Sequence, residues 1–596
     1  MRTIFYGIFM TRDFDLKVKE IHHLRQNTVY PTLLKGQNVW DGSECGTGKT
    51  SDMTEFLIMH DELIPLILCP TYEVCNTVSQ LFAANPHELA KLVQDQRVTP
   101  CVIFRSKYAH DPDHPEDPKK YMCMRGKSER SFPGCYLDVS EYTLNELKVL
   151  KKYVKNDYHV WSVDDDITHP FAYECSFREI CAYQRQIEEF KEIGEIPVIT
   201  TVELGRTVNE ILIKQGIRVN LVVWEESFED KLIKQLTYGY DRDGNERVLK
   251  ITAVDCARYG IGFKTTLISS EKNDDCRYKM VTLKDLHIRV TDPKSYAIKA
   301  FFGSTDPKHL IARQYGNQTP FYTFFGLWTG YLPAVKRKTP WLMNSASVTK
   351  EIVQILLNPK GFVSFEPLIL HRNPMLWVVL EAYLAKSEDL YASLVEFLRG
   401  IQEKGKTSMG IGTKLRFEQR IQNDIPGIHV AHYKQLGSNT LDLDYDLVVI
   451  FCGYADKPQI LREFSLLGFT ESMIDQFQIS TSQQMIGRFR LLLHPDVPVL
   501  SIVPKWALAK FDKQRTKRIT RPEFKLFACN EADDAITYKI QNWLDWYVYQ
   551  TRKSPIKHQV IKMIAEGKSN AEIIDVTGCA RSHLSQYRHS IGDDRE

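Results

Sequence analysis

Short strand-like runs rich in apolar residues, some of them continuous, recur along two stretches of the chain. In the first stretch they occupy residues 37–40, 63–69, 197–201 and 220–224. In the second they occupy residues 341–343, 408–413, 447–451 and 497–503. Runs without alternation are typical of parallel strands buried on both faces. A helical pattern over 51–60 follows the first run. The pattern predicts an α/β fold built on two parallel sheets.

The segments between these runs set the expected domain limits. Residues 101–185 are rich in Pro, Asp, His, Lys and Cys and have poor periodicity, so we interpret them as an insertion. Residues 230–340 hold several short strand-like runs and form a mixed accessory segment. We expect a first α/β domain over 1–100 and 186–340, a second over 341–525, and a C-terminal helical domain over 526–596.

Composition excludes several classes of protein. The 596 residues are 43% hydrophobic, and 77 Lys and Arg nearly balance 75 Asp and Glu, which argues against a polybasic chain. No apolar run approaches the ~20 residues of a membrane-spanning helix, and the N-terminus lacks the features of a signal peptide. The 13 cysteines are therefore expected to be reduced. We expect a cytoplasmic protein without a membrane partner; its oligomeric state is not readable.

The strongest motif follows the first apolar run and consists of Ser43, Glu44, Cys45, Gly46, Thr47, Gly48, Lys49 and Thr50. It meets the phosphate-loop pattern G-x-x-x-x-G-K-[ST] except at Ser43. Gly46 and Gly48 let the backbone curl so that N–H groups face phosphate oxygens, and the next helix adds partial positive charge. Lys49 would reach the β- and γ-phosphates of ATP, and Thr50 would ligate Mg²⁺. The alternative is a chance glycine-rich turn.

Such a loop needs a carboxylate at the end of a buried strand to hold Mg²⁺ and a second to polarise water. The run at 220–224 leads directly into Glu225 and Glu226, which we prefer for these two roles. The rival is the acidic triplet at 164–166, which follows a poor buried strand. For that triplet a turn or a helix cap is the better interpretation.

The order of motifs resembles the DEAD/DEAH-like helicases of superfamily 2, which have two RecA-like domains. The resemblance implies that Gln26 reads adenine and that Pro70, Thr71, Thr200 and Thr201 face nucleic acid. It gives Ser345, Ala346 and Ser347 the role of coupling hydrolysis to strand movement, with 303–305 as a weaker rival. Gly437 and Asn439 resemble a second coupling motif. Gln484 and Arg488 resemble the motif whose arginine stabilises the γ-phosphate, and Arg490 is its tentative second arginine.

Three departures from the family pattern stand out. Ser43 replaces a common glycine or alanine. Glu225 replaces the usual aspartate and is longer by one methylene, which changes the Mg²⁺ geometry. The family's second arginine usually lies three residues after the first, where this chain has Leu491; Arg490 is one position early, ~100° around a helix.

The insertion contains Cys123, Cys135, Cys175 and Cys181. In the iron–sulfur group of these helicases (XPD and DinG), four cysteines in the same interval hold a [4Fe–4S] cluster, which the resemblance implies here. The spacing differs from theirs and lacks a tight pair. Thiolates also suit Zn²⁺, for which His110, His114 and His169 widen the choice of ligands. The remaining alternative is a set of separate buried thiols.

The C-terminal tail predicts three short helices with a turn at Thr577-Gly578 and a cap at Ser569 or Asn570. This arrangement resembles a helix-turn-helix, whose last helix enters the major groove. Arg581, Ser582, His583, Gln586 and Arg588 would then face DNA. A three-helix interaction or lid module with the same core is the alternative.

Together these features predict an ATP- and Mg²⁺-dependent helicase or translocase acting on single-stranded or forked DNA. The alternatives are a DNA-remodelling translocase, a packaging motor, and a DNA-binding regulator that uses nucleotide as a switch. No nuclease carboxylate cluster of the kind a packaging motor needs follows the motor region. The unusual sequence between motifs suggests a gene carried by a virus or a mobile element.

Overall fold

The chain is described here from a computed structural model, and it divides into two compact units that are treated separately. One covers 1–370, 435–438 and 457–484, and the other covers 371–434, 439–456 and 485–596. Within them the structure describes residues 18–43, 47–84, 101–117, 119–126, 132–154, 156–161, 170–192, 195–225, 233–240, 246–268, 277–284, 286–316, 318–328, 339–345, 350–357, 361–366, 375–380, 391–392, 395, 398–399, 401–402, 408–413, 415–432, 445–451, 465–470, 473, 485, 489, 497, 499–504, 517–520, 524–529, 560, 563–564 and 568–590.

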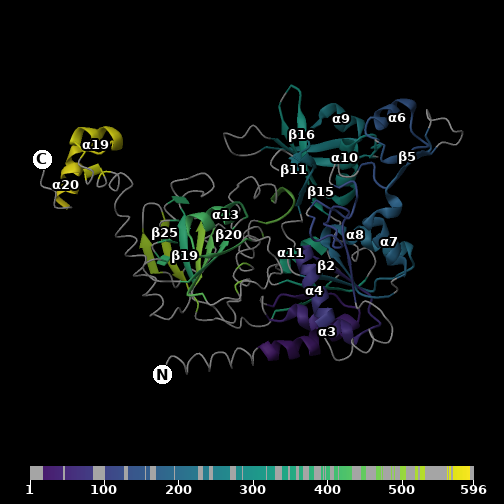
Figure 1. The fold of residues 1–596 in the computed structure, drawn as a ribbon, viewed down its shortest axis with the longest axis horizontal. Coiled ribbons are helices and arrows are strands. Elements are labelled where there is room, and N and C mark those ends of the chain that lie inside the picture. Colours follow the sequence, from purple (N-terminus) through teal and green to yellow (C-terminus); the bar gives the residue numbers. More distant parts are fainter. Residues whose placement is uncertain are drawn as a thin grey trace. The chain divides into compact units, whose positions relative to one another are not determined.

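A seven-stranded parallel sheet forms the centre of the first unit (Figure 1). Its strands, in spatial order, are β18 (Val363–Phe365), β1 (Val39–Asp41), β17 (Trp341–Asn344), β8 (Leu221–Glu225), β2 (Pro65–Cys69), β7 (Val198–Thr201) and β3 (Val102–Phe104). Because all strands run the same way, the residues that follow them meet at one edge. The predicted α/β class with a parallel sheet is confirmed.

Helices cover both faces of this sheet, as a sheet that is apolar on both sides requires. One face packs against η1 (Arg25–Val29), α2 (Tyr30–Leu34), α3 (Lys49–Met59) and α4 (Tyr72–Ala84). The other packs against α7 (Ala182–Glu192), η4 (Val202–Leu204), α8 (Gly205–Lys214) and α11 (Lys350–Leu357). Trp224 is fully buried in this second layer and meets Trp341 edge to face.

Two strands lie elsewhere than expected. The run at 341–343, which we predicted to begin the second domain, is β17 and lies between β1 and β8 of the first sheet. Residues 102–104, predicted to lie in the insertion, form the edge strand β3 of the same sheet. Both are short apolar runs, and apolarity shows that a strand is buried without showing which sheet buries it.

The accessory segment forms an antiparallel sheet with its own core. Strand β16 (Phe321–Trp328) pairs with β12 (Ile251–Thr252), β9 (Ile233–Gln235) and β15 (Thr305–Tyr315), and β14 (Arg277–Leu283) and β13 (Ile261–Ile268) continue the sheet. Helices α9 (Ala253–Arg258) and α10 (Pro293–Ser304) and the hairpin β10 (Thr237–Tyr240) and β11 (Glu246–Val248) accompany it. The described residues between 233 and 328 therefore form a folded element that lies, along the chain, between the paired strands β8 and β17.

The insertion contains a small antiparallel sheet in the order β4 (Tyr136–Asp138), β6 (Ala172–Cys175) and β5 (Tyr158–Trp161). Helix α6 (Leu144–Lys151) begins with a capping box between Thr143 and Glu146 and packs Leu147 and Leu150 on this sheet. A short turn, η3 (Arg178–Ile180), then leads into α7.

The second unit holds a seven-stranded mixed sheet. Its order is β21 (His429–His432), β20 (Met409–Thr413), β22 (Leu447–Phe451), β23 (Val499–Pro504), β19 (Met375–Leu380), β25 (Phe524–Cys529) and β24 (Lys517–Thr520), and helix α13 (Leu415–Asp424) follows β20. Only β25 runs opposite to the other strands of this sheet, because it pairs antiparallel with both β19 and β24. A Cβ at Gly412 would lie 2.5 Å from Met485, so the close packing of this strand requires glycine there.

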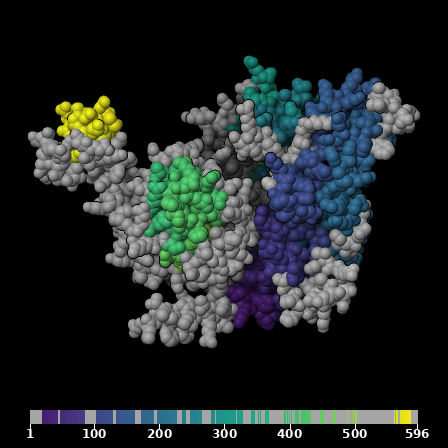
Figure 2. All heavy atoms as spheres, in the orientation of Figure 1, coloured from purple at the N-terminus to yellow at the C-terminus, as the bar shows by residue number. Residues whose placement is uncertain are grey.

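The tail contains α19 (Asn570–Thr577) and α20 (Arg581–Ser590), which Figure 2 shows as one compact group. Ser569 caps α19 in a capping box with Glu572, and Gly578 ends it with φ +64°. Val560, Ile564, Ile573, Cys579 and Leu584 form its small core. The predicted cap at Ser569 and the turn at Gly578 are confirmed. Within the described part of the chain, no helix has the length and apolarity needed to cross a membrane.

Candidate functional site

The predicted phosphate loop lies along the chain between strand β1 and helix α3. Gly48 has φ +77°, a left-handed conformation that favours glycine, and it precedes the first helical residue, Lys49. The Lys49 Nζ atom donates a hydrogen bond to the Ser43 carbonyl oxygen at 2.5 Å, which folds the lysine back across the loop. Glu44, Cys45 and Gly46 lie outside the described residues. The context of strand, loop and helix that the motif requires is present.

Glu225 ends strand β8 and is 1% exposed. The Thr50 hydroxyl donates to its Oε1 atom. The Nδ2 atom of Asn344, on the neighbouring strand β17, donates to its Oε2 atom at 2.9 Å. A carboxylate and a hydroxyl that meet beside the loop form the oxygen donor set that suits Mg²⁺. Glu226 lies outside the described residues.

An arginine that we did not single out organises the loop. Arg25 is fully buried, and all five of its N–H donors are used. Its Nε atom donates to Asp41 at 2.7 Å, and Nη1 donates to the Thr47 carbonyl oxygen and to Asp52, each at 2.7 Å. Its Nη2 atom donates to the hydroxyls of Ser43 at 2.5 Å and Thr47 at 2.7 Å.

The charge of Arg25 is balanced within this network. Burial lowers its pKa, but the carboxylates of Asp41 and Asp52 outweigh burial, so its pKa is raised above the ordinary value. The sequence did carry one signal. Ile21, Arg25, Val29 and Leu33 are all buried at a spacing of four residues, so the arginine lies on the apolar face of a helix. Gln26, predicted to read adenine, is half-buried beside it.

The residues predicted to face nucleic acid divide into two groups. Pro70 and Thr71 follow β2, and Thr201 ends β7 beside them, so these three lie at the same edge of the sheet as the loop. Thr71 also accepts a hydrogen bond from the Val74 amide at the start of α4. Thr200 is fully buried, and its hydroxyl donates to the Phe104 carbonyl at 2.9 Å. Thr200 therefore contributes to packing, and its side chain does not reach the surface.

Ser345 is the coupling residue that the structure places beside the loop. Its amide donates to the Asp41 carbonyl at 3.1 Å, and its carbonyl accepts from Trp40 Nε1 at 3.3 Å. The rival segment at 303–305 instead ends helix α10 and begins β15 of the accessory sheet. Seven further residues predicted for coupling or catalysis lie outside the described residues: Ala346, Ser347, Gly437, Asn439, Gln484, Arg488 and Arg490.

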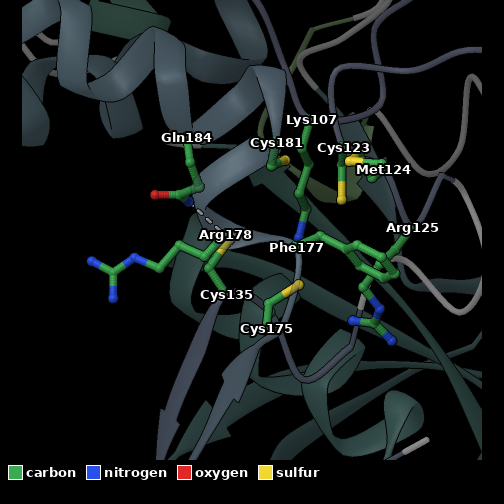
Figure 3. Close-up of a pocket in the computed structure, with 11 residues that line it drawn as sticks. Lys107, Cys123, Met124, Arg125, Cys135, Cys175, Phe177, Arg178, Cys181 and Gln184 are labelled. Carbon is green, nitrogen blue, oxygen red and sulfur yellow. Dashed lines mark hydrogen bonds between the residues drawn. The ribbon is translucent and has the colours of Figure 1, made fainter. Parts of the chain in front are cut away.

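The four cysteines chosen from the insertion line one cavity (Figure 3). They come from four segments: the loop after β3, the residue before β4, the end of β6, and the turn before α7. Gln184 Nε2 donates to Cys135 Sγ at 2.9 Å, and Cys181 Sγ donates to the Met122 carbonyl at 3.3 Å. Lys107, Arg125 and Arg178 line the same cavity, and Lys107 extends its ammonium group toward the sulfur atoms (Figure 3).

Three thiols of this four-cysteine pocket, those of Cys135, Cys175 and Cys181, favour their protonated forms. A hydrogen bond with Cys123, followed by burial, raises the pKa of Cys181. Burial raises the pKa values of Cys135 and Cys175, although Lys107 and Arg125, respectively, oppose the shift. At neutral pH these groups are therefore thiols, and any metal that they bind must displace their protons.

Four thiols are a donor set that iron–sulfur clusters and Zn²⁺ both use. No three His, Cys, Asp or Glu side chains of the described residues are drawn together as closely as bound ligands are. The four sulfurs nevertheless face one space, and the lining cations could offset thiolate charge. His110 and His114 do not line the pocket and instead approach Asp117 and Glu116; His169 lies outside the described residues. The histidine variants of a zinc site are therefore not supported.

Helix α20 carries the residues predicted to contact DNA. Arg581, Ser582 and His583 are exposed on its first turn, whereas Leu584 is buried in the core of the tail. Gln586 and Arg588 lie further along α20.

Comparisons with known proteins give only distant likenesses. No protein-family model matches the chain, and no curated protein matches it. A solved structure named "XPD_Helicase" is 10% identical, with a TM-score of 0.42 over 81% of this chain and 95% of that chain. "XPD_APO" is 9% identical, with a TM-score of 0.39 over 80% and 94%. "Structure of S. tokodaii Xpd4" is 9% identical, with a TM-score of 0.33 over 83% and 98%. With TM-scores below 0.5, these likenesses establish neither fold nor function.

Proposed function

We propose that the chain is an ATP-dependent helicase or translocase that moves on single-stranded or forked DNA. The observation that carries the nucleotide part is the contact between Thr50 and Glu225 beside the lysine-bearing loop. A hydroxyl and a carboxylate from distant parts of the chain meet where the loop would place the terminal phosphates. A glycine-rich turn formed by chance would not require this pairing.

The residues of the proposed site would have separate roles in ATP hydrolysis. Lys49 would leave the Ser43 carbonyl to reach the β- and γ-phosphates. Thr50 and Glu225 would hold Mg²⁺, which neutralises charge that develops on the transferred phosphoryl group. Glu226 would orient the attacking water, and Arg488, with Gln484 and Arg490 in the same motif, would stabilise the transition state. These last four assignments rest on the sequence.

The nucleic-acid part of the proposal rests on the order of motifs and on position. Pro70, Thr71 and Thr201 lie at the edge of the sheet that carries the phosphate loop. A nucleic-acid strand held there would therefore respond to movements of the protein that accompany nucleotide binding. Phosphate contacts would give the motor little sequence preference. Any preference would come from Arg581, Ser582 and His583 on α20, with Gln586 and Arg588 predicted to join them.

The test is ATP hydrolysis by the purified full chain, with and without single-stranded DNA, beside Lys49→Ala. We expect DNA to stimulate turnover and Lys49→Ala to abolish it. Strand separation on a forked duplex then distinguishes a helicase from a translocase that only remodels complexes. DNA binding without turnover would contradict the motor and favour a regulator that uses nucleotide as a switch.

We also propose that the four-cysteine pocket holds a metal through Cys123, Cys135, Cys175 and Cys181, either a [4Fe–4S] cluster or Zn²⁺. The support is that four thiols from separate segments face one cavity lined by cations. An anaerobic preparation would be examined by metal analysis and by absorbance near 400 nm, where iron–sulfur clusters absorb. Iron with colour supports the cluster, and one colourless zinc per chain supports zinc. Four titratable thiols without metal would leave only a buried thiol group.

A further inference from the structure

We propose that Arg25 is a positioning residue for nucleotide binding, because it holds the phosphate loop in a binding-ready shape from the side opposite the ligand. This inference rests on the proposed nucleotide site. Arg25 reaches three parts of that site together: the strand end at Asp41, the loop at Ser43 and Thr47, and the first turn of α3 at Asp52.

The orientation of one peptide group links Arg25 to the ligand side. In a trans peptide, the carbonyl of one residue and the N–H of the next point in opposite directions. The Thr47 carbonyl points at Arg25 and accepts from Nη1 at 2.7 Å. The Gly48 N–H therefore points away from Arg25, toward the side on which the loop would cradle phosphate. The arginine thus determines where one of the loop's N–H donors faces.

Ser43 explains why this loop needs such support. The common pattern has glycine at this position, and here a serine occupies it with 1% exposure. Its hydroxyl donates to Asp41 Oδ1 at 2.5 Å and accepts from Arg25 Nη2 at 2.5 Å, and its amide donates to Asp41 Oδ1 at 3.0 Å. The serine side chain is therefore part of the hydrogen-bond network around Arg25 and points toward Asp41 and Arg25, away from the proposed phosphate position. Ser43 and Arg25 thus act together to position the loop.

The geometry requires a guanidinium and not merely a positive charge. Five donors in a planar fork meet two carboxylates, two hydroxyls and one carbonyl. A lysine ammonium has three donors at a single atom and cannot span these acceptors. Arg25→Lys therefore keeps the charge that balances Asp41 and Asp52 but leaves loop acceptors without a donor. A role in charge balance alone would survive this substitution.

The experiment measures two quantities on the full chain: the Kd for a fluorescent ATP analogue, and hydrogen exchange of the peptide spanning residues 43–50 without nucleotide. We expect Arg25→Lys to raise the Kd at least tenfold and to accelerate exchange of that peptide. Lys49→Ala should weaken binding but accelerate exchange less than Arg25→Lys does, because it removes a ligand contact and one hydrogen bond within the loop, to the Ser43 carbonyl, and leaves the five Arg25 contacts in place. Val208→Ala, in the core of helix α8, is the stability control. It should lower the melting temperature without changing either quantity.

The outcomes separate the two proposals. Wild-type binding with Arg25→Lys unchanged in Kd and exchange overturns the positioning role and leaves the nucleotide site in place. No nucleotide binding by the wild type overturns the proposed function and this inference with it. Should Arg25→Lys fail to fold, Thr47→Val replaces it, because it removes one acceptor and leaves the charges paired. We then expect a threefold or larger rise in Kd, and an unchanged Kd would contradict the inference.

Discussion

Asn344 and Glu225 face each other across the neighbouring strands β17 and β8, and the asparagine amide donates to the glutamate carboxylate at 2.9 Å. The same carboxylate accepts from Thr50 through its other oxygen. Both side chains are almost fully buried. The longer glutamate thus reaches the loop with one oxygen while the asparagine holds the other. Both carboxylate oxygens of Glu225 are therefore held by hydrogen bonds within the first unit.

The pairing predicts that Asn344→Ala impairs hydrolysis more than it impairs nucleotide binding. Without the amide, the Glu225 carboxylate loses its fixed orientation toward Thr50 and the Mg²⁺ position. We expect kcat to fall about tenfold, equivalent to ~1.4 kcal/mol, and the Mg²⁺ concentration for half-maximal rate to rise. Steady-state kinetics over a Mg²⁺ series measure both effects.

Asn220 provides a matched control for Asn344, because it is also a hydrogen-bonded asparagine but lies next to the start of β8, at the opposite end from Glu225. Its side chain accepts from the Ile64 amide at 2.7 Å and donates to the Glu62 carbonyl at 2.8 Å, just before β8 begins. Asn220→Ala should lower stability without altering the Mg²⁺ dependence. Equal effects of the two substitutions on kcat would show that Asn344 acts only through stability.

The sequence predicted most strands of the two parallel sheets because each is a short run rich in apolar residues, although β19 was not among them. It did not predict the sheet to which each strand belongs. The run beginning at Trp341 resembles the strands that follow it in the sequence, yet it pairs with β1 and β8. Pairing between strands so distant along the chain depends on the folded accessory segment that brings their ends together, and local patterning does not reveal it.

In the candidate site, too, local motifs were predictable from the sequence, whereas contacts between distant residues were not. The loop and Thr50 were predicted from a fixed local spacing, and Glu225 from its position at the end of a buried run; the structure places Thr50 and Glu225 in contact. Arg25 was missed because its partners lie 16 to 27 residues away along the chain. A charged residue on the apolar face of a helix was the available signal, and such a residue requires a buried partner. The cysteine positions were chosen from a distant resemblance, and the structure does gather them in one pocket.

If the four-cysteine pocket binds a metal, the metal content of the protein should depend on each of the four cysteines. If the four thiols bind one metal, Cys175→Ser should reduce the bound iron or zinc per chain severalfold, since serine is a poor ligand for these metals. Cys123→Ser should do the same. Elemental analysis of anaerobically purified protein measures the loss.

Cys256 offers the control for these substitutions. It is buried in the core of the accessory sheet and does not line the pocket. Cys256→Ser should therefore retain the metal content of the wild type. Metal content that persists in both Cys123→Ser and Cys175→Ser would show that these thiols are only packed together.

Cys256 also predicts a pH dependence of stability. Burial, with a smaller contribution from the charge of Asp255, raises the pKa of its thiol from 9.0 to about 12. Because the folded state holds the proton more tightly than the unfolded state, this contribution is complete below pH 9 and is lost as the pH rises toward 12. The melting temperature of the wild type should fall more steeply between pH 9 and 11 than that of Cys256→Ala. Parallel curves would contradict the assignment.

The tail predicts separable effects of folding and of charge on DNA binding. Ser569 caps α19 through its hydroxyl and lies outside α20, so Ser569→Ala should destabilise the tail by ~1 kcal/mol.

Arg581 is exposed on the first turn of α20. Arg581→Ala should weaken duplex binding and, if it contacts a phosphate, reduce the salt dependence by about one charge without changing stability. Binding titrations at several salt concentrations and thermal melts measure both.

The comparison that decides between a DNA-binding helix and a plain interaction module is Lys568→Ala. Lys568 is exposed and precedes α19, so its substitution removes one positive charge from the same small group without touching α20. If α20 contacts DNA, Arg581→Ala weakens binding several-fold more than Lys568→Ala does. If the two substitutions have equal effects, the tail attracts DNA only through its overall charge. In that case the exposed first turn of α20 is better explained as a surface for a protein partner.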